Sequence, residues 1–499
     1  MSRCAADLVA SNPQSPEGYF LAGLAEKAGG HPARAAEHFA RALELDAARY
    51  DAAIELASRY SVTGRHPEAF DLLQRYEPHL DSSPRYLDLA GFTYATIGLH
   101  ERAWPLYRRA NELQPGVPRF MAHLAASAVY LGKFGEAKAL YRALLDREPA
   151  HQRNHYQLAQ LERAGDTTHV EQMKAVLRTT QLPPARNIFL YYAIGKELED
   201  LGQWDEAFEY YRMAGDAVTS IADYDAAVDV ALIDTIIATC TPAWLAQGAP
   251  AAVASGKTPI FIVGLPRTGT TLTERILASH SQVESIGETL QLPAALRRIS
   301  GVETPDAMNA AIVAAAATRD LRPLADVYMG GIRHRLGDRP MFIEKYPENF
   351  LLLGFIARAW PDARLVYLRR NPMDSCFAMY KQSYFKAAYT LENLGRYYVA
   401  HDRLLRHWRA TLGARLIEVR YESLVTDQEG ETRALLARLG LPFEPACLEF
   451  EKNVTSSATA SAVQVREKMH ARSVNRWKRF ERQLQPLRRI LEDAGIAIE

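Results

Sequence analysis

Cysteine is scarce in this chain, and long apolar runs are absent. The four cysteines among 499 residues stand at positions 4, 240, 376 and 447, and none forms a Cys-x-x-Cys pair. This spacing argues against a zinc or redox site and against a dense disulfide framework. No apolar run approaches the roughly 18 residues of a membrane span, and the N-terminus lacks the apolar core of a signal peptide. We therefore expect a cytoplasmic protein without a membrane partner.

Net charge is also lacking, because 59 basic side chains balance 59 acidic ones. Residues 1–257 hold 25 basic and 32 acidic side chains, a net of −7, whereas residues 258–499 hold 34 and 27, a net of +7. We expect the basic part to bind an anionic small molecule. We expect no nucleic-acid partner. No His, Cys and Asp cluster has metal-ligand spacing, so we also expect no metal.

A 34-residue period runs through the acidic part. Glycines recur at that spacing, at Gly30, Gly64, Gly98 and Gly132. An alanine follows each glycine after five residues, and a large side chain follows after four more, namely Phe39, Leu73, Tyr107 and Tyr141. Glycine permits a tight turn between two helices, alanine lets the helices approach, and the large residue fills the groove. The pattern resembles tetratricopeptide repeats, which have the same period.

The helical pattern extends past these regular units. Segment 153–186 fits the template poorly, and Gly202, Ala207 and Tyr211 then restore the spacing. Residues rich in Pro, Ala, Gly and Ser follow and indicate a linker. We predict a tetratricopeptide-repeat helical array at 1–240, a linker at 241–257 and a second domain at 258–499. The concave surface of such a solenoid suits an acceptor peptide or protein, and assembly into a homodimer is the alternative.

A phosphate-binding loop opens the second domain. Residues 259–264 form an apolar run rich in β-branched side chains, which is typical of a buried parallel strand. Gly264 and Gly269 bracket the next four residues, and helical periodicity follows. Backbone N–H groups in such a loop, together with the helix dipole, attract a phosphate. The expected contacts are Arg267, Thr268, Gly269, Thr270 and Thr271.

The loop differs from that of nucleoside triphosphatases. Thr270 occupies the position of their lysine, and Arg267 supplies a positive charge inside the loop instead. This favours a donor with one 5′-phosphate and one transferable group over a triphosphate. A P-loop kinase is one alternative. An adaptor with tetratricopeptide repeats and an inactive nucleotide-binding domain is another.

Residues 258–480 resemble the sulfotransferases that use 3′-phosphoadenosine 5′-phosphosulfate, in particular the tyrosyl-protein sulfotransferases and their bacterial relatives. Leu265-Pro-Arg-Thr-Gly-Thr-Thr271 looks like their 5′-phosphosulfate loop, and several further motifs follow in the expected order. The resemblance implies a P-loop-like α/β domain with a parallel sheet. It also implies a metal-free transfer of a sulfuryl group to an acceptor hydroxyl, with a protein tyrosine, a saccharide and a small alcohol as candidates.

Two of these motifs correspond to the catalytic residues of the family. Within Ile286-Gly-Glu-Thr289, Glu288 would be the base that accepts the acceptor's hydroxyl proton. Within Phe342-Ile-Glu-Lys-Tyr-Pro347, Lys345 would stabilise the charge on the departing phosphate. Together with Arg267 they form the expected catalytic set.

The remaining motifs would hold the rest of the donor. Arg370 resembles the family's 3′-phosphate ligand, and Ala378 stands where the family usually carries a serine, so that Ser375 is the expected substitute. Tyr421 resembles a residue near the adenine. The C-terminal segment resembles one that closes over the donor, with Ser461, Gln464, Arg466 and Lys468 as contacts.

Overall fold

The computed structural model describes residues 2–247 and 256–498, and these residues form two compact units. The first unit comprises Met1–Leu140, Tyr328–Leu336 and Val454–Ala458, and the second comprises Tyr141–Val327, Gly337–Asn453 and Thr459–Glu499. Residues 248–255 of the expected linker lie outside the described residues, and α15 (Pro242–Ala246) precedes them. The boundaries drawn from the sequence stay a prediction.

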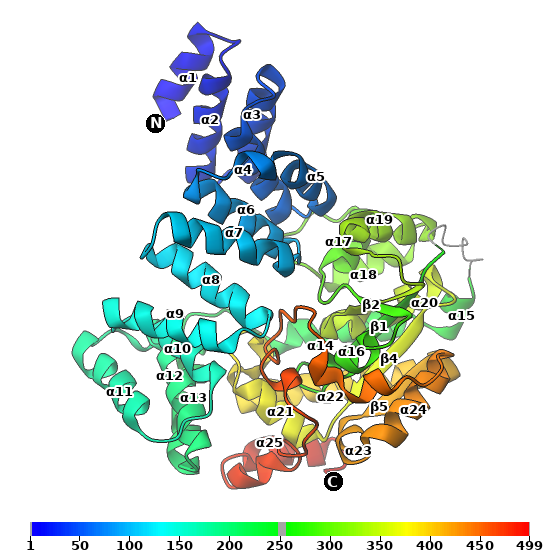
Figure 1. Ribbon diagram of the computed structural model, residues 1–499. Helices are drawn as coiled ribbons and strands as arrows, with labels where there is room; N and C mark the ends of the chain where they lie inside the picture. The colour runs from blue at the N-terminus through cyan, green and yellow to red at the C-terminus, as the bar shows by residue number, and fades with distance from the viewer. Residues whose placement is uncertain (1, 248–255, 499) are drawn as a thin grey trace. The chain divides into compact units, whose positions relative to one another are not determined.

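Helix pairs build the first unit. After α1 (Ser2–Ser11), the chain forms α2 (Pro16–Ala28), α3 (Pro32–Leu45), α4 (Tyr50–Val62), α5 (His66–Tyr76), α6 (Pro84–Thr96), α7 (His100–Leu113), α8 (Pro118–Tyr130) and the start of α9 (Phe134–Arg147). The pairs α2/α3, α4/α5 and α6/α7 stack on one another in the order of the sequence (Figure 1).

The repeat spacing has the structural meaning expected from the sequence. The four periodic glycines all have a positive φ, between 74° and 84°, in the turns between paired helices. Residues Ala35, Ala69, Ala103 and Ala137 are fully buried. The large residues are buried as well, and a Cβ added at Gly91 would lie 2.9 Å from the Tyr107 ring. The prediction of a tetratricopeptide-type helical array is confirmed.

The irregular stretch of the array is also helical. It contains α10 (Gln152–Leu161) and α11 (Thr168–Thr180), followed by α12 (Ile188–Asp200), α13 (Trp204–Thr219) and α14 (Ala226–Thr239). His155 Nδ1 lies 2.9 Å from His169 Nε2. The other ring nitrogen of His169, Nδ1, lies 2.7 Å from Glu197 Oε1. This polar chain joins three helices where the repeat template fails.

A five-stranded parallel sheet forms the centre of the second unit. Its strands are β1 (Thr258–Gly264), β2 (Val283–Ser285), β3 (Met341–Lys345), β4 (Arg364–Arg369) and β5 (Leu416–Arg420). They lie in the order β2-β3-β1-β4-β5. Ile262 pairs with Lys345 on β3, and Gly264 pairs with Leu368 on β4. The carboxyl ends of β1, β3 and β4 therefore meet at one edge, where ligands bind in sheets of this kind.

Helices enclose the sheet. Those after β1 are α16 (Thr270–Ala278), α17 (Gln291–Ser300), α18 (Ala310–Ala317), α19 (Arg322–Ile332), α20 (Leu353–Ala359), α21 (Pro372–Tyr380), α22 (Leu391–Leu412), α23 (Tyr421–Thr426), α24 (Gln428–Leu439) and α25 (Gln485–Asp493). On one face of the sheet, Ile262 and Val366 pack with Leu277 of α16 and Leu436 of α24. The predicted α/β fold with a parallel sheet is confirmed. Among the described residues, no helix is both long and apolar enough to span a membrane.

Candidate active site

The predicted phosphate loop connects β1 to α16 at the carboxyl edge of the sheet. Gly264 has φ 144°, and a Cβ there would lie 2.6 Å from the Leu368 carbonyl oxygen. Gly269 has φ 100° and precedes α16 directly, and a Cβ there would lie 2.7 Å from Tyr421 Cδ2. Thr268 Oγ1 donates to the Leu265 carbonyl at 2.7 Å, which closes the loop from within. A side chain at either glycine would collide with these neighbours, so the loop can pack this closely against β4 and Tyr421 only with glycine at both positions.

Arg267 has the unusual backbone of a loop residue under constraint. Its φ is 68°, a region that side chains other than glycine rarely adopt. Its guanidinium donates to Ser461 Oγ and, at 2.8 Å, to Gln464 Oε1. Three residues that the sequence assigned to the donor site, separated by almost 200 positions, therefore lie together.

Lys345 and Glu288 form an ion pair at the end of β3. The Lys345 side chain is completely buried, and its Nζ donates to Glu288 Oε1. The Lys345 backbone N–H donates to the Gly287 carbonyl at 3.0 Å, which fixes the Gly-Glu turn beside the strand. The two predicted catalytic residues are thus adjacent although 57 positions separate them.

Arg370 follows β4 and is held by backbone carbonyls. Its Nη1 donates to the Arg267 carbonyl at 2.8 Å, and its Nη2 donates to the Ser473 carbonyl at 2.6 Å. Its guanidinium lies 4.7 Å from the centre of the Tyr421 ring. Burial lowers the pKa of Arg370 below its usual value. Among the described residues, its Nε has no hydrogen-bond partner and no carboxylate forms an ion pair with it.

The other predicted contacts lie at different distances from the loop. Thr270 and Thr271 are both buried at the start of α16, and Thr271 Oγ1 lies 3.4 Å from Thr459 Oγ1. Ser375 is buried in α21, and its hydroxyl donates to the Arg370 carbonyl at 3.5 Å. Among the described residues, Lys468 forms no hydrogen bond or ion pair with the loop, and its side chain is exposed.

Arg466 is directed toward a carbonyl outside the loop. Its Nη1 lies 3.5 Å from the Asn453 carbonyl oxygen, and Arg275 of α16 donates to the same carbonyl. This contact links the C-terminal segment to the helix that follows the loop.

Two carboxylates at this site were not assigned from the sequence. Glu274 of α16 lies 3.8 Å from Lys345 Nζ, and Asp374 of α21 accepts from the backbone N–H groups of Asn475 and Trp477 at 2.6 and 3.0 Å. Burial raises the pKa of both carboxyl groups. A signal for Glu274 was present, because it follows Thr270 by four residues and so lies on the same side of the helix.

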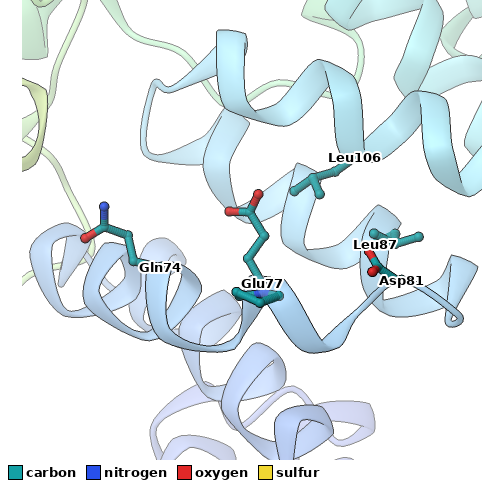
Figure 2. A pocket seen from close by; sticks show the side chains of 6 residues that line it. Gln74, Glu77, Asp81, Leu87 and Leu106 are labelled. Carbon is teal, nitrogen blue, oxygen red and sulfur yellow. The ribbon is translucent and has the colours of Figure 1, made fainter.

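A separate pocket lies in the first unit. It has a volume of about 360 Å³ and is lined by Gln74, Glu77, Pro78, Asp81, Leu87 and Leu106 (Figure 2). The Tyr94 hydroxyl donates to Glu77 Oε2 at 2.6 Å, so one of the two carboxylates that line the pocket already has a hydrogen-bond partner. The lining has no cation for a phosphate. Across residues 2–247 and 256–498, no three His, Cys, Asp or Glu side chains gather so as to hold a metal ion.

Comparison with known proteins agrees with the geometry of the loop and the ion pair. Residues 259–445 match the model of the sulfotransferase family, and residues 16–83 and 85–161 match a tetratrico peptide repeat model. The C-terminal domain is thus similar to the sulfotransferase family over residues 259–445. The loop, Glu288, Lys345 and Arg370 all lie within the part of this sulfotransferase domain that the family model matches.

Known relatives cover different parts of the chain. An uncharacterized protein of Aquifex aeolicus (strain VF5) is 29% identical over 345 residues, which are 66% of this chain and 44% of that protein. The chain therefore spans less than half the length of this relative. Protein-tyrosine sulfotransferase 1 of Danio rerio is 24% identical over 230 residues, 44% of this chain and 65% of that protein. The sulfotransferase domain of the Synechococcus PCC 7002 olefin synthase is 21% identical, with a TM-score of 0.33, and covers 46% of this chain and 91% of that domain.

Proposed function

We propose that this sulfotransferase domain transfers a sulfuryl group from 3′-phosphoadenosine 5′-phosphosulfate to an acceptor hydroxyl. The observation that carries the proposal is the ion pair between Lys345 and Glu288 at the carboxyl edge of the sheet. It places a proton acceptor and a cation together beside a phosphate-binding loop. Sulfuryl transfer to a hydroxyl requires both groups, since a proton leaves the acceptor while negative charge grows on the leaving oxygen.

The residues of the loop edge fit such a donor. The loop backbone and Thr270 would hold the 5′-phosphosulfate at the start of α16. Arg370 would take the 3′-phosphate, because its guanidinium is buried and its Nε has no hydrogen-bond partner among the described residues. Asp374 and Glu422 act on it electrostatically, but neither forms a direct ion pair with it among these residues. Tyr421 would lie next to the purine. The donor supplies an activated sulfuryl group, and no other co-reactant is required.

The roles of the catalytic side chains follow from their charges. Glu288 accepts the proton of the acceptor hydroxyl as the new O–S bond forms. Lys345 donates a hydrogen bond to the bridging oxygen of the donor while the bond between that oxygen and sulfur breaks. The electron pair of the broken bond stays on the phosphate. Arg267 balances the charge of the transferred group from the loop, and Ser461 and Gln464 hold its guanidinium.

We further propose a protein or peptide acceptor, with a tyrosine hydroxyl as the first candidate. The repeat array supports a peptide or protein, because tetratricopeptide repeats present extended surfaces. The name of the Danio rerio relative supports the tyrosine.

A transfer assay tests the proposal. Purified protein is incubated with donor labelled with sulfur-35 and with a panel of tyrosine peptides, saccharides and small alcohols. We expect label in at least one acceptor, and at least a hundredfold lower kcat in Glu288→Gln with little change in the affinity for adenosine 3′,5′-bisphosphate. Glu284→Gln is the matched control, because Glu284 of β2 pairs with Lys257 at 3.1 Å instead of Lys345. Full activity of Glu288→Gln would refute the assignment of the base.

A further inference from the structure

Glu274 is a buried carboxylate that the catalytic roles above leave unused. Its side chain lies in α16 and is 7% exposed. Its Oε2 lies 3.8 Å from Lys345 Nζ, and Lys345 also donates to Glu288. The Lys345 cation at the end of β3 therefore lies near two carboxylates, one from the helix after the loop and one from the Gly-Glu turn.

The second oxygen of Glu274 reaches the turn that carries Glu288. Ser285 Oγ donates to Glu274 Oε1 at 2.6 Å, and the same Ser285 oxygen accepts from the Gly287 N–H at 3.0 Å. Gly287 has φ 64°, and its carbonyl accepts from the Lys345 N–H. Glu274 thus contacts Lys345 directly and is connected to Glu288 through one serine.

Burial of this carboxylate is unfavourable on its own. Desolvation raises the pKa of Glu274, while Lys345 and the Ser285 hydrogen bond oppose that rise. A buried charge persists only where partners compensate for lost water. The compensating partner here is the cation that the reaction needs.

We propose that Glu274 is a positioning residue for sulfuryl transfer, which holds the Lys345 ammonium so that Glu288 does not engage it alone. An ammonium has three N–H donors. One donor is directed to Glu288, and Glu274 attracts the ammonium through its charge at 3.8 Å, so that a donor is left for the leaving oxygen. A single carboxylate beside a cation accepts a proton less readily, and a second carboxylate shares the charge of that cation. The inference rests on the proposed function.

The first test is the isosteric variant Glu274→Gln. It keeps the acceptor for Ser285 and removes the charge next to Lys345. We expect kcat to fall about 10- to 100-fold, the range of a misplaced catalytic group. We expect the Kd of adenosine 3′,5′-bisphosphate to stay within about twofold, because Glu274 acts on the donor through Lys345, whose hydrogen bond to the leaving oxygen strengthens as charge develops during transfer. Glu284→Gln is again the control and should leave kcat unchanged.

The pH profile separates positioning from a general structural role. Glu274 faces Lys345, Glu288 and Ser285, and the charge of Arg275 also acts on it. Because its pKa is raised, Glu274 takes up a proton at a higher pH than an exposed glutamate does, and the neutral form no longer holds Lys345. In the wild type, both Glu274 and Glu288 must be ionised for activity. On the acid side, a plot of log kcat against pH should therefore approach a slope of two. In Glu274→Gln the slope should be one.

Each outcome decides between the proposals. An active wild type together with unchanged kcat and slope in Glu274→Gln would overturn the positioning role alone. An inactive wild type would overturn both this role and the proposed function. If Glu274→Gln loses nucleotide binding, Glu274→Asp is measured instead, because aspartate keeps the negative charge. A slope of two in its plot of log kcat against pH supports the positioning role. A slope of one overturns that role.

Discussion

Arg370 shows how a buried cationic side chain can be held by backbone carbonyls and an aromatic ring without a direct ion pair. Two backbone carbonyls and the Tyr421 ring fix its guanidinium, yet no carboxylate forms an ion pair with it among the described residues. Neighbouring Arg369 differs, since it pairs with Glu418 at 3.4 Å. The two adjacent arginines therefore have different surroundings, and only Arg370 is proposed to bind an anionic ligand.

Replacement of Arg370 by Lys should weaken nucleotide binding. Lysine keeps the charge but loses the planar fork that contacts both carbonyls and a phosphate at once. A loss of about 1.5–3 kcal/mol, typical for hydrogen bonds to charged groups, corresponds to roughly 10- to 100-fold in Kd. Titration calorimetry with adenosine 3′,5′-bisphosphate measures it. Arg369→Lys should bind within about twofold of the wild type, and an equal loss in both variants would contradict the assignment.

At the scale of elements, the loop between β1 and α16 depends on a backbone that turns sharply under an aromatic ring. Gly269 is both the residue before α16 and the neighbour of Tyr421, which supports Arg370. The local sequence pattern of strand, loop and helix was enough to predict this element, because its spacing is short and its glycines are required. The ring above the loop could not be predicted in the same way, since Tyr421 is more than 150 positions away.

Gly269→Ala should therefore lower the free energy of unfolding by more than replacement of another glycine with a left-handed backbone does. Backbone strain alone costs about 1–2 kcal/mol, and displacement of the Tyr421 ring should add about 1–3 kcal/mol. Gly440 is the control, because it ends α24 with φ 77° and has open space at its Cβ position. We expect Gly269→Ala to lower both the free energy of unfolding in urea and nucleotide affinity, and Gly440→Ala to lower only the former. Equal effects would contradict the role of the ring contact.

At the scale of the molecule, the last helices of the repeat array, α10 to α13, belong to the same compact unit as the sheet. Glu199 of α12 is buried and accepts from Lys381 Nζ at 2.9 Å, from Arg476 Nε at 2.6 Å and from Tyr211 at 2.7 Å. Arg476 belongs to the segment whose Ser473 carbonyl binds Arg370. A helix of the array thus stabilises the segment that borders the donor site.

The Glu199 cluster should make stability depend on pH. Burial alone would raise the pKa of Glu199, but Lys381 and Arg476 outweigh it and lower the pKa to about 2. Such a carboxylate stabilises the fold above its usual pKa, and the contribution is lost as pH falls from about 4.5 towards 2. Glu199→Gln should lower the free energy of unfolding in urea by about 3 kcal/mol at pH 7. The difference between the variant and the wild type should shrink as the pH falls from about 4.5 towards 2. Exposed Glu209→Gln should lose less than about 0.5 kcal/mol, and a difference that stays constant with pH would contradict the prediction.

The sequence predicted what repeats locally or stands in a short motif. The tight turns at the periodic glycines follow from the repeat, and Lys345 and Glu288 were assigned to one catalytic set from their motifs, although their ion pair was not predicted. Glu274 and Glu199 did not stand out, because glutamates on helices are usually solvated, and what makes these two different is burial beside cations far away in the chain. Arg476, for instance, is 277 positions from Glu199.

The composition of the first unit has a consequence for how the protein is made. Besides Met1–Leu140, this unit includes Tyr328–Leu336 and Val454–Ala458, and Ser457 donates its N–H to the Tyr130 carbonyl at 2.9 Å. During synthesis from the N-terminus, the first helices leave the ribosome early, yet their unit stays incomplete until Ala458 has emerged. More than 300 residues beyond Leu140 must therefore be translated before the helices of this unit acquire their last native contacts.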